Sequence, residues 1–216
     1  MNVQEQFKEL LKALTPFLKS SGYSRRGQNF RTQRGENWGM LFFQKGKWNT
    51  KTELEFTVNL GVFSQSIDRF FQDWGKDAPP EWGYDHWRTR IGFVLPGRQD
   101  KWWLINEKTD LPDLVQRLQG VLSLAIAEIE KYLRDEDFRD YLLADPNNCG
   151  GYTDLHRLKC LAFLVTEYGP HEKLASIFDE WKACTNYENV RQEIESNIKR
   201  LKQIAEAKAL QPGAPV

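Results

Sequence analysis

Apolar and polar residues alternate strictly along residues 53–62, in the second half of the stretch from Trp38 to Phe63 around which the rest of the chain is organised. One parity is apolar: Leu54, Phe56, Val58, Leu60 and Val62. The other parity is polar or small: Glu53, Glu55, Thr57, Asn59 and Gly61. Because successive side chains on a strand point to opposite faces, the pattern predicts a β-strand with one buried and one polar face. We expect Phe56 and Val58 to be fully buried.

Four further segments are predicted to be strands. Residues 29–34 and 38–45 precede the central strand through short links, so the three form an antiparallel meander. Residues 38–45 are apolar on both parities, which is typical of a strand covered on both faces. Residues 88–95 predict a fourth strand with Phe93 facing inward, and residues 101–106 predict a short fifth.

Apolar residues at helical spacing predict two long helices that flank the strands in the sequence. The first spans residues 3–20, and the second begins after Asp110 and carries its stripe to Tyr132. Asp110 is a good N-cap for the second helix. We expect both helices to cover the apolar face of the sheet.

A cluster of helix breakers, DPNNCGG at residues 145–151, separates this region from a purely helical tail. In the tail, Thr153 is expected to cap one helix, and Gly169 with Pro170 to end it. The predicted fold class is α+β: an antiparallel sheet of about five strands packed by helices, with a C-terminal all-helical subdomain. The predicted domains are residues 1–148 and residues 149–216.

Composition narrows the class of protein. The 216 residues carry a formal net charge of zero, which does not indicate a nucleic-acid binder. Three widely spaced cysteines without a CxxC motif favour a reducing compartment over a disulfide framework. The first residues are charged and amphipathic, and no run of about 18 apolar residues occurs. A cytoplasmic protein that does not span a membrane is expected.

Three short motifs at the start of the chain give it a family resemblance. They are a glycine–aromatic pair after the first helix (Gly22, Tyr23), a Phe-Gln-Lys step (residues 43–45) and a Phe-Thr-Val-Asn-Leu-Gly strand (residues 56–61). Residues 5–110 resemble the bacterial domain-of-unknown-function family 4304. The resemblance implies no activity, so no residue inherits a catalytic role from it.

The polar face of the sheet is the candidate binding site. If the third and fourth strands share a sheet, their polar residues share a face, beside the long loop at residues 75–87. The predicted binding residues are Glu53, Glu55, Asn59, Trp82, Trp87, Arg88 and Arg90. Trp48, Trp82 and Trp87 are expected on the rim, because Trp and Arg dominate binding hot spots. The alternative is a solvated face with ordinary cross-strand Glu–Arg pairs.

Sequence motifs for other chemistry are weak. There is no phosphate-binding glycine loop, nucleophile elbow or HExxH motif. His86 beside Asp85 could act as a base or be a solvated loop residue. His156 and Cys160 have the i, i+4 spacing of metal ligands, with Cys149 nearby, but a fourth ligand is not evident. We expect no catalytic residue, metal or cofactor.

A basic run offers a further possibility. Lys19, Arg25, Arg26, Arg31 and Arg34 occur without an intervening acid, and such a run either binds phosphate backbones or is a solvated turn.

The sequence favours a non-catalytic protein-recognition module of the kind found among bacterial immunity and defence proteins, with another protein as the partner. The alternative is an enzyme or nucleic-acid-processing protein that uses Glu53, Glu55, Arg88 and Arg90. A third interpretation is RNA or DNA binding through residues 19–34.

Overall fold

The computed structural model describes residues 2–75, 78–144 and 153–210, and the chain divides into two compact units. Residues 1–133 form the first unit and residues 134–216 the second. The predicted boundary at residue 148 lies in the segment 145–152, outside the described residues.

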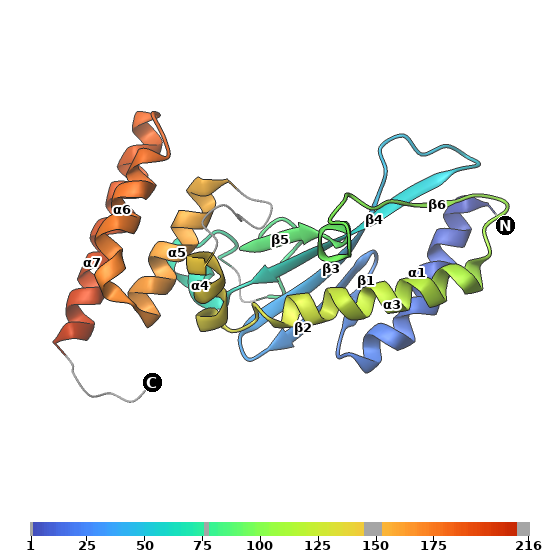
Figure 1. The fold of residues 1–216 in the computed structure, drawn as a ribbon, viewed down its shortest axis with the longest axis horizontal. Coiled ribbons are helices and arrows are strands. Elements are labelled where there is room, and N and C mark those ends of the chain that lie inside the picture. Colours follow the sequence, from blue (N-terminus) through green and yellow to red (C-terminus); the bar gives the residue numbers. More distant parts are fainter. Residues whose placement is uncertain (1, 76–77, 145–152, 211–216) are drawn as a thin grey trace. The chain divides into compact units, whose positions relative to one another are not determined.

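The first unit contains one six-stranded antiparallel sheet with helices, which confirms the α+β prediction (Figure 1). The element bounds are α1 Val3–Ser20, β1 Ser24–Arg26, β2 Asn29–Arg34, β3 Asn37–Lys45, β4 Leu54–Phe63, α2 Gln65–Phe71, β5 Trp87–Arg90, η1 Ile91–Val94, β6 Trp103–Ile105 and α3 Leu111–Glu130. The strand order is β1-β2-β3-β4-β5, and β6 pairs with the opposite end of β4 from β5.

Helices α1 and α3 pack against each other and against one face of the sheet, which we call the inner face (Figure 1). The apolar parity of β4 points to this face, and Phe56 and Val58 are fully buried, as predicted. The ring of Phe56 contacts Phe7 of α1 at 5.3 Å and Trp103 of β6 at 5.7 Å between centroids. The core of this unit therefore lies between the helix pair and the inner face.

The two helices begin where the sequence predicts. Asn2 and Glu5 form a capping box at α1, in which each side chain accepts a hydrogen bond from the backbone N–H of the other residue. The Asp110 side chain accepts from the N–H of Asp113 at the start of α3. Close packing of α3 on β3 requires a glycine, because a Cβ on Gly39 would lie 2.6 Å from the Ile129 side chain.

The opposite face of the sheet, which we call the outer face, is not the open polar surface that the alternation suggested. Thr57 is fully buried and Asn59 is 6% exposed. The Thr57 hydroxyl donates to the carbonyl of Lys101, and the loop after α2 packs over Gly61. The expected polar face of β4 is wrong beyond Glu55, because chain segments distant in sequence cover it.

The predicted fourth strand is shorter than expected. β5 ends at Arg90, and residues 91–94 turn as a 3-10 helix that leaves Phe93 44% exposed, so the prediction that Phe93 faces inward is wrong. A Cβ on Gly92 would overlap the carbonyl oxygen of Gln99, so the returning chain lies where a continued strand would run. The segment expected to be a basic turn contributes the sixth strand, β1.

The second unit is helical, as predicted. It contains α4 Asp135–Ala144, α5 Asp154–Tyr168, η2 His171–Lys173, α6 Leu174–Ala183 and α7 Glu188–Ala209. Thr153 caps α5, and α5 ends before Gly169. Helix α5 contacts α4, α6 and α7, and Leu164, Trp181 and Leu201 are buried. Across the described parts of both units, no helix has the length and apolar character needed to cross a membrane.

Candidate functional site

The strand register brings polar and aromatic residues together on the outer face. Residues directly opposite each other on neighbouring strands share a face. One row across the sheet contains Ser24, Arg31, Met40, Gly61 and Arg88. The next row contains Arg26, Asn29, Phe42, Asn59 and Arg90. Arginines therefore lie at both sides of the face, with Met40 and Phe42 of β3 between them.

The loop between α2 and β5 covers the middle of these rows and is fixed there by backbone hydrogen bonds. The His86 N–H donates to the Val62 carbonyl at 2.7 Å, and the Ser64 N–H donates to Nδ1 of His86 at 3.0 Å. Nδ1 is therefore the unprotonated ring nitrogen, and His86 is 3% exposed. The solvated-loop interpretation of His86 is wrong, because this residue anchors the loop to β4.

Asp85 fixes the loop a second time. Its carboxylate is 1% exposed and accepts two hydrogen bonds from the Arg88 guanidinium, at 2.7 and 3.2 Å. It also accepts from the N–H of Gly83 at 3.1 Å. A buried carboxylate with a bidentate arginine holds both side chains in one geometry. Asp85, in the loop that precedes β5, thus fixes the position of the Arg88 side chain.

Trp82 lies half-buried between this arginine and the sheet. Its ring stacks on Phe42 with centroids 5.4 Å apart and planes 29° apart. The Arg88 guanidinium lies 5.4 Å from the centroid of the Trp82 ring. Beneath them, Met40, Phe63 and Trp74 form a small second core. The result is a layered stack of an arginine, an indole and a phenyl ring, partly open to solvent.

Arg90 has a similar arrangement at the end of its row. Its guanidinium lies 5.3 Å from the centroid of the Trp102 ring and pairs with Asp100, which also accepts from the Trp102 indole N–H. Next to it, the Asn59 amide donates to the Gln44 side chain at 2.8 Å. We call Phe42, Asn59, Trp82, Arg88 and Arg90 the outer-face cluster.

The structure brings together four of the seven predicted site residues, Asn59, Trp82, Arg88 and Arg90, in this cluster. Glu53 precedes β4, and Glu55 lies opposite Leu104 of β6, two rows from Arg90. Trp87 is not on the rim as expected: it lies opposite Val62, is 3% exposed and contacts the Tyr132 ring at 4.7 Å. Its position one residue before Arg88 places it on the inner face.

Sequence reasoning missed Phe42, Asp85 and Trp102. The one available signal was Gly61 in the centre of a strand, since an isolated strand glycine often marks the close approach of another segment. A Cβ at Gly61 would lie 3.1 Å from both Asp85 and Trp82.

The basic run at residues 19–34 does not form one patch in the structure. Arg25 packs over Phe30 on the inner face, and Arg34 pairs with Glu130 at 3.0 Å. Arg26 and Arg31 instead belong to the outer face. Alternation along the strands β1 and β2 separates charges that are neighbours in the sequence.

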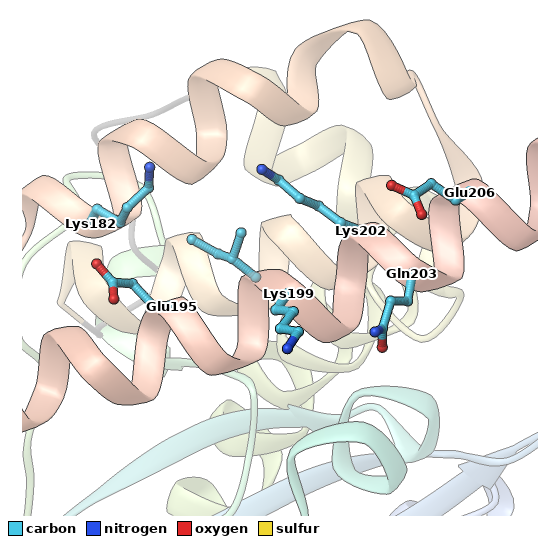
Figure 2. Close-up of a pocket in the computed structure, with 7 residues that line it drawn as sticks. Lys182, Glu195, Lys199, Lys202, Gln203 and Glu206 are labelled. Carbon is cyan, nitrogen blue, oxygen red and sulfur yellow. The ribbon is translucent and has the colours of Figure 1, made fainter.

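The second unit contains a hollow between two of its helices. It is lined by Lys182 of α6 and by Glu195, Ile198, Lys199, Lys202, Gln203 and Glu206 of α7. Figure 2 shows the α7 residues spread along their helix, with Lys182 across from them on α6. Its lysines and glutamates are mixed in sign, and it contains none of the predicted site residues.

The histidine–cysteine pair in α5 was a candidate for part of a metal site. Sγ of Cys160 lies 3.6 Å from Nε2 of His156, and Cys160 is buried. Cys149, the third expected member, is outside the described residues. Within residues 2–75, 78–144 and 153–210, no group of three or more His, Cys, Asp or Glu side chains could hold a metal ion.

Comparison with known proteins assigns the first unit to a family. A family model described as "Domain of unknown function (DUF4304)" matches residues 14–132, which nearly coincide with the first unit. No curated protein and no solved structure matches the chain. The match covers more than half of the 216 residues. The chain therefore belongs to the DUF4304 family, as the motifs between Gly22 and Gly61 predicted.

Proposed function

We propose that this protein is a non-catalytic recognition module that binds another protein through the outer-face cluster. The supporting observation is the half-exposed stack of Arg88, Trp82 and Phe42. Tryptophan and arginine are the residues most enriched at binding hot spots, which sit on well-packed and preorganised surfaces.

Preorganisation is the physical argument for binding at this position. Trp82 rests on the second core, and Arg88 is held by the buried carboxylate of Asp85. A partner would therefore meet these side chains with little further loss of rotamer entropy. A loop fixed on a rigid sheet is also where binding residues concentrate.

We also propose that the protein acts in bacterial immunity or defence and that it is located in the cytoplasm. Cys160 and Cys184 carry free thiols, which are typical of a reducing compartment.

Purification of the tagged full chain from its host, with the Trp82→Ala variant in parallel, tests the proposal. We expect one stoichiometric protein to copurify with the wild type. Its dissociation constant should rise at least tenfold for Trp82→Ala, which corresponds to about 1.4 kcal/mol. Arg90→Gln should also weaken binding, and it changes an ion pair at the surface rather than the loop packing.

Trp48→Ala is the matched control. Trp48 is 84% exposed and contacts Lys47. The expectation that it lies on the rim with Trp82 is wrong, because the β3–β4 connection is at the opposite end of β4 from the Trp82 loop. A partner that binds wild type and all of these variants equally, or a nucleic acid in place of a protein, would contradict the proposal.

A further inference from the structure

Arg31 is a largely buried arginine of the outer face whose guanidinium has no fixed counterpart among the described residues. It lies in the middle of β2, between Ser24 of β1 and Met40 of β3, and is 8% exposed. Its Nε is enclosed and has no hydrogen-bond partner. Its two Nη groups are not among the enclosed atoms, so the fork of the guanidinium reaches solvent while its stem is buried.

Two other arginines of this face are neutralised by the protein itself. Arg88 is paired with Asp85, and Arg90 with Asp100. By contrast, the guanidinium of Arg31 makes no hydrogen bond or ion pair with the part of the chain that the structure describes, and neither does the guanidinium of Arg26.

The electrostatic surroundings of Arg31 compensate its charge only in part. Burial lowers the pKa of Arg31, and the positive charge of Arg26 lowers it further. Glu81 acts in the opposite direction from the covering loop, although it does not hydrogen-bond Arg31. A partly buried guanidinium with an enclosed Nε is normally paired, because its desolvation is costly otherwise. A site with this imbalance gains from an incoming anion.

Arg31, Asn29 and Arg26 form a group of hydrogen-bond donors on β1 and β2, which we call the arginine corner. Asn29 precedes Arg31 by two residues and faces the same way, and Arg26 lies opposite Asn29 on β1. Asn29 is in turn directly opposite Phe42, the base of the Trp82 stack. Neighbouring strands lie about 4.8 Å apart, so the arginine corner lies about 5–10 Å from the aromatic stack.

We propose that Arg31 and Arg26 bind a carboxylate of the partner protein, from an Asp or Glu side chain that lies beside the residue covering Trp82 and Phe42. This inference rests on the proposed function and names the chemistry of the partner. A planar guanidinium with a fixed stem presents two parallel donors, which match a carboxylate. The distance to the stack corresponds to neighbouring residues on a partner surface.

A protein carboxylate fits this corner better than a nucleic-acid backbone. A phosphate backbone repeats its charge every few ångströms and requires an extended positive surface. Here Glu81, Asp85 and Asp100 lie on or beside the same face, and two of them already neutralise arginines. One isolated anion can be accepted, and a row of anions would be repelled.

The test is an NMR titration of the full chain that follows the Nε–H resonance of Arg31. The enclosed Nε should exchange slowly enough with water to be observed. The probes are the capped peptide acetyl-Glu-Trp-amide, its glutamine counterpart acetyl-Gln-Trp-amide, and inorganic phosphate. We expect the glutamate peptide to shift this resonance saturably and to bind at least tenfold more tightly than the glutamine peptide.

Variants separate the site from its surroundings. Arg31→Gln and Arg31→Lys remove the Nε–H resonance, so the peptide affinities of all variants are measured from the shift of the Trp82 indole N–H resonance. Arg31→Gln should abolish the difference between the two peptides, and Arg26→Gln should reduce it. Arg31→Lys keeps the charge without the fork, so it should retain only part of the difference. Arg117→Gln, in an exposed pair with Asp113 on α3, is the control and should change nothing.

Equal affinities of the two peptides for the wild type would overturn the inference without any need for a variant. Phosphate that binds here more tightly than the glutamate peptide would also overturn it, in favour of a phosphate ligand. A copurified partner whose affinity responds to Trp82→Ala and not to Arg31→Gln would refute the carboxylate site alone. A glutamate-selective peptide response without any copurified protein would refute the proposed function alone.

Discussion

Replacing Gly61 with alanine should release the loop that builds the outer-face cluster while leaving the inner core intact. An added Cβ would lie 3.1 Å from Asp85 Cβ and from Trp82 Cζ3, whereas relaxed carbon contacts are about 3.5–4.0 Å. Neither neighbour can rotate away easily. Asp85 is held by Arg88 and by the Gly83 N–H, and Trp82 is stacked on Phe42.

The magnitude follows from two opposing effects. Overpacking a well-filled site costs about 1–3 kcal/mol. Alanine also reduces the flexibility of the unfolded chain, which stabilises the folded state by about 0.4–1 kcal/mol where the backbone conformation suits alanine. Gly61 lies within the extended strand β4 and has no positive φ, so that gain applies. The expected net destabilisation of the loop is therefore about 0–2.6 kcal/mol, with a midpoint of about 1.3 kcal/mol.

Amide hydrogen exchange is the suitable assay, because a chain with two units need not unfold in one transition. The His86 N–H reports on the loop, since it donates to the Val62 carbonyl. The Val58 amide in the centre of β4 reports on the core. In Gly61→Ala, exchange should accelerate at His86 and change little at Val58.

Gly120→Ala is the matched control. Gly120 lies inside α3 and a Cβ there would meet nothing within 4 Å, so alanine should stabilise the helix by about 0.5–1 kcal/mol. If Gly61→Ala left His86 exchange unchanged, the loop would not be seated against Gly61, and the derived geometry of the cluster would be refuted.

Three further predictions concern the first unit. Phe56→Ala should cost about 3–5 kcal/mol in urea unfolding, because the ring is fully buried, and a cost below about 1 kcal/mol would contradict its core position. Tyr23→Phe should be nearly neutral at pH 7, since the buried hydroxyl has no hydrogen-bond partner among the described residues. Burial, followed by the negative charge of Glu130, raises the pKa of Tyr23 above its usual value of 10.0. The folded state therefore keeps the proton, and the stability present below pH 10 falls as the pH rises beyond it. Tyr23→Phe should flatten that alkaline loss, and an identical pH profile for the two proteins would show that Tyr23 is not its source. A fragment of residues 1–133 should give a dispersed amide spectrum, and a collapsed spectrum would mean that it cannot fold alone.

Local pattern determined the secondary structure and the inner core. Alternation along β4 identified the buried parity, and helical spacing identified α1, α3 and α5, with Asp110 and Thr153 as N-caps of the last two. Helix α4 was not predicted. These signals work because each depends on the geometry of a single element, which repeats every two or 3.6 residues. The three motifs between Gly22 and Gly61 were also sufficient to identify the family.

Tertiary structure decided the second face of the sheet. Thr57 and Asn59 are polar and alternate with apolar residues, so the sequence placed them in solvent. A loop and the Lys101 segment cover them instead, and their hydrogen bonds go to groups distant in the chain. Nothing local in β4 encodes this cover except the missing side chain at Gly61.

Tertiary structure also decided which charged residues lie near each other. Arg25 and Arg26 are neighbours in the sequence and lie on opposite faces of the sheet, whereas Arg31 and Arg88 share a row although 57 residues separate them. Strand register sets these neighbours, and it depends on pairing between distant segments. The sequence alone determined which residues could form a site, and only the fold determined which of them meet.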